Sequence, residues 1–213
     1  MIKAIETQYN GYRFRSRLEA RWAIFFDIAG IAYHYEPEGY DLSSAVCEVH
    51  TKPPLVGPYG IEGLESCVCP EIQSLQGKDC WYLPDFFLPQ VTLRYEPTPG
   101  LFFEVKGILN TKDENRCKVL GAVTGKPVIL AAINTPGSFE EGGNRIIEEG
   151  LEQIWPWWDT YMVFMRCANS LCGHIKIEFW NSHYMSCPKC NSPTIYNDPV
   201  FTRATRAAKQ ARF

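Results

Sequence analysis

The sequence predicts an α/β protein in which a mixed β-sheet is flanked by helices, followed by a small cysteine-bound module. Helix-like and strand-like segments alternate along residues 1–160, which is typical of a sheet covered by helices. Two pairs of closely spaced cysteines follow in a segment of about forty residues, which is too short to stabilise itself by burial alone. The chain of 213 residues is 46% hydrophobic, which suffices for one good core and argues against disorder throughout.

The first predicted helix runs from Ser16 to Ala29, and Gly30 follows it as a natural C-cap. Its apolar residues recur at helical spacing: Leu18, Trp22, Phe25 and Ala29. Residues 31–36 (IAYHYE) are β-prone and precede Pro37, so we expect a strand that ends at a turn.

Residues 37–80 differ in character from the segments on either side. They contain Gly/Pro clusters, four of the nine cysteines, and 7 acidic against 2 basic residues, without sustained periodicity. We interpret this segment as an insertion that has no hydrophobic core of its own.

Two short aromatic strands are expected next, over Trp81–Leu88 (WYLPDFFL) and Gly100–Gly107 (GLFFEVKG). A helix follows over Lys112–Gly125, with Thr111 as its candidate N-cap and acidic residues in its first turn. The apolar run Lys126–Ile133 predicts a strand that is covered on both faces.

A last, Glu-rich helix is expected from about Phe139 to Trp155. It would turn four apolar residues inward: Ile146, Ile147, Leu151 and Ile154. Three tryptophans surround Pro156: Trp155, Trp157 and Trp158. We expect them to pack between the sheet domain and the cysteine-bound module, in preference to stacking on nucleic-acid bases.

Two carboxylates and a lysine are expected to converge where two of the strands meet. Asp85 lies at one end of a strand, and the two-residue period of a strand places Glu104 and Lys106 on the same face of the next. Carboxylate oxygens bind Mg²⁺, and the metal neutralises phosphate charge and lowers the pKa of a bound water. Lys106 would orient or deprotonate that water, so the pattern indicates a phosphodiesterase.

Asp85, Glu104 and Lys106, in the order PD...EVK, resemble the PD-(D/E)XK nuclease superfamily with its restriction-endonuclease-like fold. The core of that fold runs helix, three strands, helix, strand (αβββαβ), which matches the order predicted for residues 16–133. The stretch FRSRLEARWAIFFDIAG...YEPEGYDL also resembles small phage and bacterial proteins of the superfamily, and the endonuclease subunits of some transposases. The resemblance covers about residues 11–133.

The resemblance implies a DNA endonuclease that depends on Mg²⁺ or Mn²⁺, with Glu19, Asp85, Glu104 and Lys106 as catalytic residues. It implies that Asp85, Glu104 and the backbone carbonyl of Val105 bind the metal, joined by Glu19 from the first helix.

Each of these residues also has a purely structural interpretation. Asp85 can cap a turn, and Lys106 can be an ordinary lysine at a strand end. Glu19 fits a capping box in which it reaches back to the N–H of Ser16. Arg15 and Glu19 also form an i,i+4 pair, worth only a few tenths of a kcal/mol.

The cysteines predict a zinc ribbon near the C-terminal end. Cys167-x4-Cys172 and Cys187-x2-Cys190 flank the β-prone IKIEFW, a spacing that lets four thiolates close around one structural Zn²⁺. A second zinc site is an open alternative to free buried cysteines in the insertion. Its candidate ligands are Cys47, His50, Cys67, Cys69 and Cys80. Cys117 lies alone and is expected in the core.

Charge is divided unevenly along the chain. Residues 1–159 carry a net charge of -8, whereas residues 160–213 carry +5, which suggests a polyanion such as DNA as partner. Candidate phosphate contacts on the first helix are Arg15, Arg17 and Arg21, with solvated surface arginines as the alternative. The tail adds Arg203, Arg206, Lys209 and Arg212, on a helix capped by Thr202 or on a frayed, solvated terminus.

We therefore expect a nuclease domain over residues 1–160 with the insertion 37–80, a zinc ribbon over 161–199 and a basic tail over 200–213. No run of eighteen apolar residues or signal peptide occurs, so a cytoplasmic protein of bacterial or phage origin, without a membrane partner, is expected. A non-catalytic nucleic-acid-binding or regulatory protein that keeps the fold is the competing interpretation. RNA or branched substrates, a homodimer and a protein partner stay open.

Overall fold

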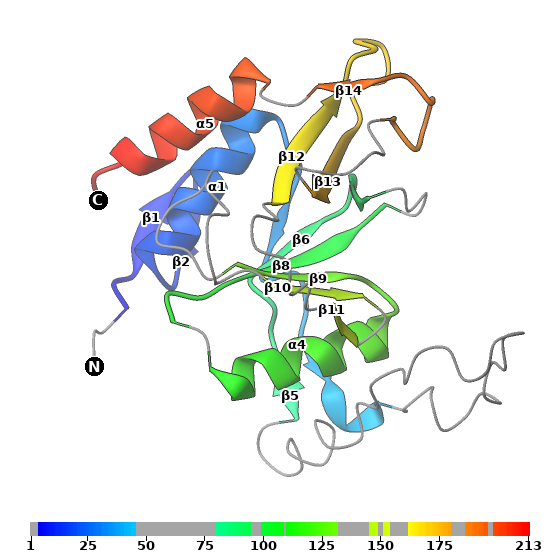
Figure 1. Ribbon diagram of the computed structural model, residues 1–213. Coiled ribbons are helices and arrows are strands. Elements are labelled where there is room, and N and C mark those ends of the chain that lie inside the picture. The colour runs from blue at the N-terminus through cyan, green and yellow to red at the C-terminus, as the bar shows by residue number, and fades with distance from the viewer. Residues whose placement is uncertain are drawn as a thin grey trace, which may run out of the picture.

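A six-stranded mixed sheet forms the centre of the protein in the computed structural model (Figure 1). The structure describes residues 4–45, 80–94, 99–108, 110–131, 145–148, 151–153, 162–179, 186–195 and 198–213. In spatial order the strands are β11 (Leu151–Gln153), β10 (Arg145–Glu148), β9 (Val128–Ala131), β8 (Leu101–Val105), β6 (Phe86–Leu88) and β3 (His34–Tyr35). Only β8 and β9 pair in parallel among them, and the helix α4 (Thr111–Thr124) connects the two.

Alternate residues of β8 and β9 point into two separate layers of core. Leu101, Phe103 and Ile129 face the helices α1 (Arg17–Ala29) and α5 (Pro199–Gln210). On the other face, Phe102, Val128 and Leu130 pack with Cys117, Val119 and Leu120 of α4. The sheet therefore lies between helices on both faces, and the expected core position of Cys117 is confirmed.

The N-terminal part confirms the first predicted helix and adds a hairpin that was not predicted. Ser16 is the N-cap of α1, and Gly30 ends the helix in the left-handed conformation at φ 67°. The hairpin of β1 (Thr7–Tyr9) and β2 (Tyr12–Phe14) turns at Asn10 and Gly11 and packs against α1.

A four-stranded sheet carries the C-terminal hairpin. Its order is β14 (Thr194–Ile195), β12 (Met162–Cys167), β13 (Ile175–Phe179) and β7 (Val91–Leu93). Strand β13 confirms the β-prone segment between the cysteine pairs. Its hairpin partner β12 ends at Cys167, so the described hairpin encloses the first cysteine pair and does not lie between the two pairs. The parallel pairing of β13 with β7 was not predicted. Phe164, Ile177 and Phe201 belong to the same core as α1, so this part shares its apolar packing with the central sheet.

Helix α5 packs along α1 (Figure 1). Asp198 is its N-cap, so the prediction of Thr202 in this role is wrong; Pro199 at the first helical position favours the earlier start. Arg166 on β12 joins the two helices, because its Nε lies 3.0 Å from Asp198 Oδ2 and its Nη2 donates to the carbonyl of Ala29 at 2.5 Å.

The largest error of the prediction concerns residues 139–155. The expected helix is wrong for the described residues there, which form the antiparallel strands β10 and β11. Ile146 and Ile147 are β-branched, and pairing of β10 with β9 extends the central sheet. Two adjacent isoleucines in a four-residue strand define neither the helical nor the strand period, and the available strand partner decides the outcome.

Smaller corrections concern the other elements. Asn110, and not Thr111, is the N-cap of α4. The expected strand over residues 81–88 is divided at Pro84, because β5 (Trp81–Tyr82) pairs with β4 (Tyr40–Asp41) and β6 joins the central sheet. A short 3-10 helix, η1 (Leu42–Ser44), follows β4.

Candidate functional site

The two strand carboxylates lie side by side in the interior. Phe86 of β6 pairs with Phe103 of β8, which brings Asp85 next to Glu104. The N–H of Asp85 donates to Glu104 Oε2 at 3.0 Å, and the N–H of Val105 donates to Asp85 Oδ2 at 2.9 Å. Both carboxylate residues are only 1% exposed. The predicted convergence of these two residues is confirmed.

Lys106 completes the predicted trio and lies at the opening of the site. Its Nζ forms an ion pair with Glu104 and lies 3.7 Å from Asp85 Oδ2, and its side chain is 24% exposed. Burial alone would lower the pKa of Lys106, but attraction to Asp85 and Glu104 raises it overall. The ammonium group therefore stays charged and can donate hydrogen bonds to a ligand.

Arg15 and Glu36 extend the cluster, and sequence reasoning missed Glu36. The Nη2 of Arg15 lies 2.5 Å from Asp85 Oδ1, and its Nε lies 2.7 Å from Glu36 Oε1. Glu36 has a φ of 45°, which is unusual for a residue other than glycine, and its N–H donates to the carbonyl of Asp85 at 2.9 Å. Its place directly before Pro37, at the end of a β-prone segment, was the available signal.

Glu19 sits at the start of α1 and forms the expected cap. Its N–H donates to Ser16 Oγ at 3.2 Å, and Ser16 Oγ donates to Glu19 Oε1 at 2.7 Å. Glu19 Oε2 accepts from the Arg15 N–H at 3.1 Å and from the Tyr35 hydroxyl at 2.7 Å. The capping box is thus confirmed with one correction, because the carboxylate reaches the N–H of Arg15 in place of that of Ser16. The role of Glu19 as a metal ligand stays a prediction.

We call Glu19, Glu36, Asp85 and Glu104, with Arg15 and Lys106, the carboxylate cluster. Burial raises the pKa of Asp85 well above its usual range, and the charge of Glu104 raises it further, against the opposing effects of Lys106 and Arg15. When all four carboxylates are ionised, the two cations leave an excess of negative charge. Hard carboxylate oxygens are the ligands that Mg²⁺ prefers in proteins, and the expected binding of Mg²⁺ by these residues stays a prediction. The expected role of the Val105 carbonyl stays a prediction.

The second site is formed by Cys167, Cys172, Cys187 and Cys190, which we call the cysteine cluster. All four Sγ atoms lie within 4.8 Å of one another, with 3.4 Å between Cys167 and Cys190 and 3.9 Å between Cys172 and Cys187. Four sulfurs at about 2.3 Å from a central Zn²⁺ would be about 3.8 Å apart. The cluster can therefore hold a zinc ion, as the spacing predicted.

Tight turns hold the thiols in place. Gly173 and Asn191 adopt left-handed φ values of 59° and 57°, and the N–H of Asn191 donates to the carbonyl of Cys187 at 2.8 Å. Hydrogen bonding to Ser192 lowers the pKa of Cys190 to about 6, whereas burial raises that of Cys167 to about 12. One thiolate thus forms readily, and ionisation of the buried one is coupled to metal binding.

Other predicted metal ligands are not in this cluster. Cys80 lies half-buried before β5, and the remaining candidates of a second zinc site fall outside the described residues: Cys47, His50, Cys67 and Cys69. The tryptophans at 155, 157 and 158 also fall outside them.

Helix α5 presents a basic face to solvent. Its three cations Arg203, Arg206 and Lys209 are exposed, and so is Arg212, which lies two residues after the helix. Phe201, Ala204 and Ala208 are buried on the opposite face. The helix continues to Gln210, so the alternative of a frayed terminus is wrong for this stretch. Of the other predicted arginines, Arg17 is exposed and Arg21 is half-buried.

No family model matches the chain, and neither a curated protein nor a solved structure matches it. Within the described residues, no helix combines the length and apolar character needed to cross a membrane.

Proposed function

We propose that this protein is a divalent-metal-dependent nuclease that hydrolyses phosphodiester bonds in DNA, and that it acts as an endonuclease. The observation that carries the proposal is the meeting of Asp85, Glu104 and Lys106 at neighbouring ends of β6 and β8. Two carboxylates that are 1% exposed and share one lysine are costly to bury. Such an arrangement is more typical of a catalytic site than of a structural ion pair.

Asp85 and Glu104 would hold Mg²⁺ or Mn²⁺, with Glu19 and the Val105 carbonyl as further candidate ligands. When bound, the metal neutralises charge on the phosphate and lowers the pKa of a water molecule. The backbone N–H of Val105 orients Asp85, and the N–H of Asp85 orients Glu104. The two carboxylates therefore keep their positions without needing a ligand.

The raised pKa of Lys106 in the metal-free protein favours its charged form, which donates hydrogen bonds. Lys106 thus orients the attacking water or stabilises charge that develops on the phosphate. Arg15, with a side chain that is 49% exposed, can leave Glu36 to contact a phosphate oxygen.

The remaining features support nucleic-acid binding. The cysteine cluster would hold one structural Zn²⁺ as the core of a zinc ribbon, and its four protein ligands leave no position for catalysis. The basic face of α5 would contact phosphates without reading sequence.

The proposal is tested by incubating circular and linear DNA with the full chain and Mg²⁺, Mn²⁺ or no added divalent metal. We expect nicked or linear products only with metal, and loss of cleavage by about a hundredfold or more in Lys106→Ala protein. Lys112→Ala, which removes an exposed lysine at the start of α4, is the matched control. Equal cleavage by the Lys106→Ala protein would overturn the assignment. No cleavage by the unaltered protein, with DNA binding retained, would favour the non-catalytic alternative.

A further inference from the structure

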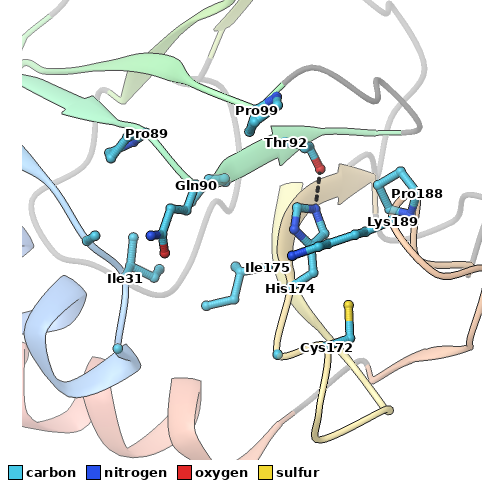
Figure 2. A pocket seen from close by; sticks show the side chains of 14 residues that line it. Ile31, Pro89, Gln90, Thr92, Pro99, Cys172, His174, Ile175, Pro188 and Lys189 are labelled. Atoms are coloured by element: carbon cyan, nitrogen blue, oxygen red, sulfur yellow. Dashed lines mark hydrogen bonds between the residues drawn. The ribbon is translucent and has the colours of Figure 1, made fainter.

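A cavity of about 460 Å³ lies beside the cysteine cluster, at the end of α1 remote from Glu19 (Figure 2). Five segments of the chain line it: residues 30–32 after α1, residues 89–92 from the end of β6 into β7, Pro99, and residues 172–175 and 188–189 at the two cysteine turns. Its size is that of a small-molecule site. The cavity exists only because β13 pairs with β7 and brings the cysteine turns onto the central body.

The walls of the cavity are mainly apolar, with a few polar groups that point into it. The apolar lining is made by Ile31, Pro89, Val91, Pro99, Ile175 and Pro188. Figure 2 shows the side chains of Gln90 and Lys189 extending toward the same space from different segments. His174 is fixed by a hydrogen bond between its Nε2 and Thr92 Oγ1 at 2.9 Å.

The charge of the residues that line the cavity indicates which kind of ligand it can bind. None of the described residues that line the cavity is acidic, although the whole chain has a net charge of -3, and Lys189 supplies a cation. A suitable ligand therefore has an apolar body, an edge with hydrogen-bonding groups, and negative charge. A nucleotide has all three properties.

We propose that this cavity binds one unpaired nucleotide of a single-stranded segment. The base would lie between the apolar walls, with its edge at the amide of Gln90 and its phosphate at Lys189. A paired base does not fit this arrangement, because it is stacked in the duplex and its Watson–Crick edge is occupied. The inference rests on the proposed function, since it makes single-stranded or branched DNA a preferred substrate of the same enzyme.

The distance to the carboxylate cluster is compatible with one bound strand. Glu19 and Gly30 mark the two ends of α1, and the eleven steps between them span about 17 Å at 1.5 Å per residue. A few nucleotides of one strand cover this length.

The test measures binding without cleavage. Full-length, zinc-loaded Lys106→Ala protein is titrated, without added divalent metal, into a labelled single strand and into the same sequence as a blunt duplex. Gln90→Ala and Lys189→Ala are introduced separately in this background. Both side chains are exposed, so their removal should leave the fold intact. Gln8→Ala and Lys112→Ala remove exposed residues elsewhere and are the matched controls.

We expect each cavity variant to weaken single-strand binding by about tenfold and duplex binding by less than about twofold. Thymidine monophosphate should displace the strand from the cavity, and inorganic phosphate at the same concentration should not. Three results would overturn the inference: unchanged single-strand affinity in both variants, an equal loss of duplex affinity, or equal displacement of the strand by phosphate. Binding to the duplex in any of these cases would still support the proposed function. Failure of the unaltered protein to bind any DNA would overturn both.

Discussion

The carboxylate cluster and the cysteine cluster both gather side chains that bind cations, but they differ in what holds them together. In the carboxylate cluster, Lys106 and Arg15 contact Asp85 and Glu104 directly, and strand pairing fixes the backbone. In the cysteine cluster, the four thiols come from the end of β12 and from turns. The first site can therefore form from protein groups alone, whereas we expect the second to need a bound metal for much of its stability.

The comparison predicts that loss of a cysteine has the largest effect on stability. Cys187→Ser should lower the zinc content from about one per chain to near zero, and should lower the free energy of unfolding by several kcal/mol. Elemental analysis and denaturant unfolding measure the two effects. Cys117→Ala, which alters a buried thiol outside the cluster, should keep its zinc. Full zinc content in the Cys187→Ser protein would contradict the assignment of the cluster.

Neutralisation of the basic face of α5 should change DNA binding without unfolding the helix. The four exposed cations are replaced together by glutamine: Arg203, Arg206, Lys209 and Arg212. The slope of log affinity against log salt should become shallower by up to about 3.6 for duplex DNA, since each phosphate contact contributes about 0.9. Deletion of the helix is a poorer test because it would uncover α1. An unaltered slope would show that this face does not hold DNA.

Asp85→Asn should make the stability of the metal-free protein less dependent on pH. Because the folded protein raises the pKa of Asp85, it binds more protons than the unfolded chain between the ordinary carboxyl pKa of about 3.9 and the raised value. Stability therefore falls as the pH rises through this interval. Urea unfolding across this range should show a flatter profile for Asp85→Asn than for the unaltered protein. Identical profiles would mean that Asp85 is not the group responsible.

Glu19→Gln is expected to have the smallest effect. Its carboxylate is occupied by Ser16, Tyr35 and the N–H of Arg15, so the isostere should lower stability by about 1 kcal/mol or less. Cleavage should stay within about tenfold of the unaltered protein if Glu19 acts only as a cap. A fall of several orders of magnitude would instead identify Glu19 as a metal ligand.

The parts of the fold that local sequence determines were predictable. The α1 helix has an N-cap, an apolar stripe and a C-cap glycine, and all three signals lie between Ser16 and Gly30. The cysteine cluster was likewise predictable, because the short spacing within each cysteine pair is visible in the sequence. By contrast, β10 was mistaken for helix because its two adjacent isoleucines define no period, and its pairing with β9 is a long-range contact that local sequence does not show.

The residues around Asp85, Glu104 and Lys106 could not be predicted, because their contacts join segments that are far apart in the sequence. Arg15 and Asp85 are 70 residues apart in sequence and meet only after α1 docks on the sheet. The cavity beside the cysteine turns depends in the same way on the pairing of β13 with β7. Sequence therefore predicted the three central residues, and tertiary packing added Glu36, Tyr35 and the fixed position of Arg15.

The most direct test of the central claim measures the binding of Mn²⁺ to the zinc-loaded protein by electron paramagnetic resonance. We expect Mn²⁺ to bind the unaltered protein, and Asp85→Asn to weaken this binding by about tenfold or more. Glu38→Gln, which changes an exposed carboxylate outside the cluster, should leave the Mn²⁺ affinity unchanged. Equal binding by the Asp85→Asn protein, or no binding by the unaltered protein, would contradict the assignment of the carboxylate cluster as a divalent-metal site.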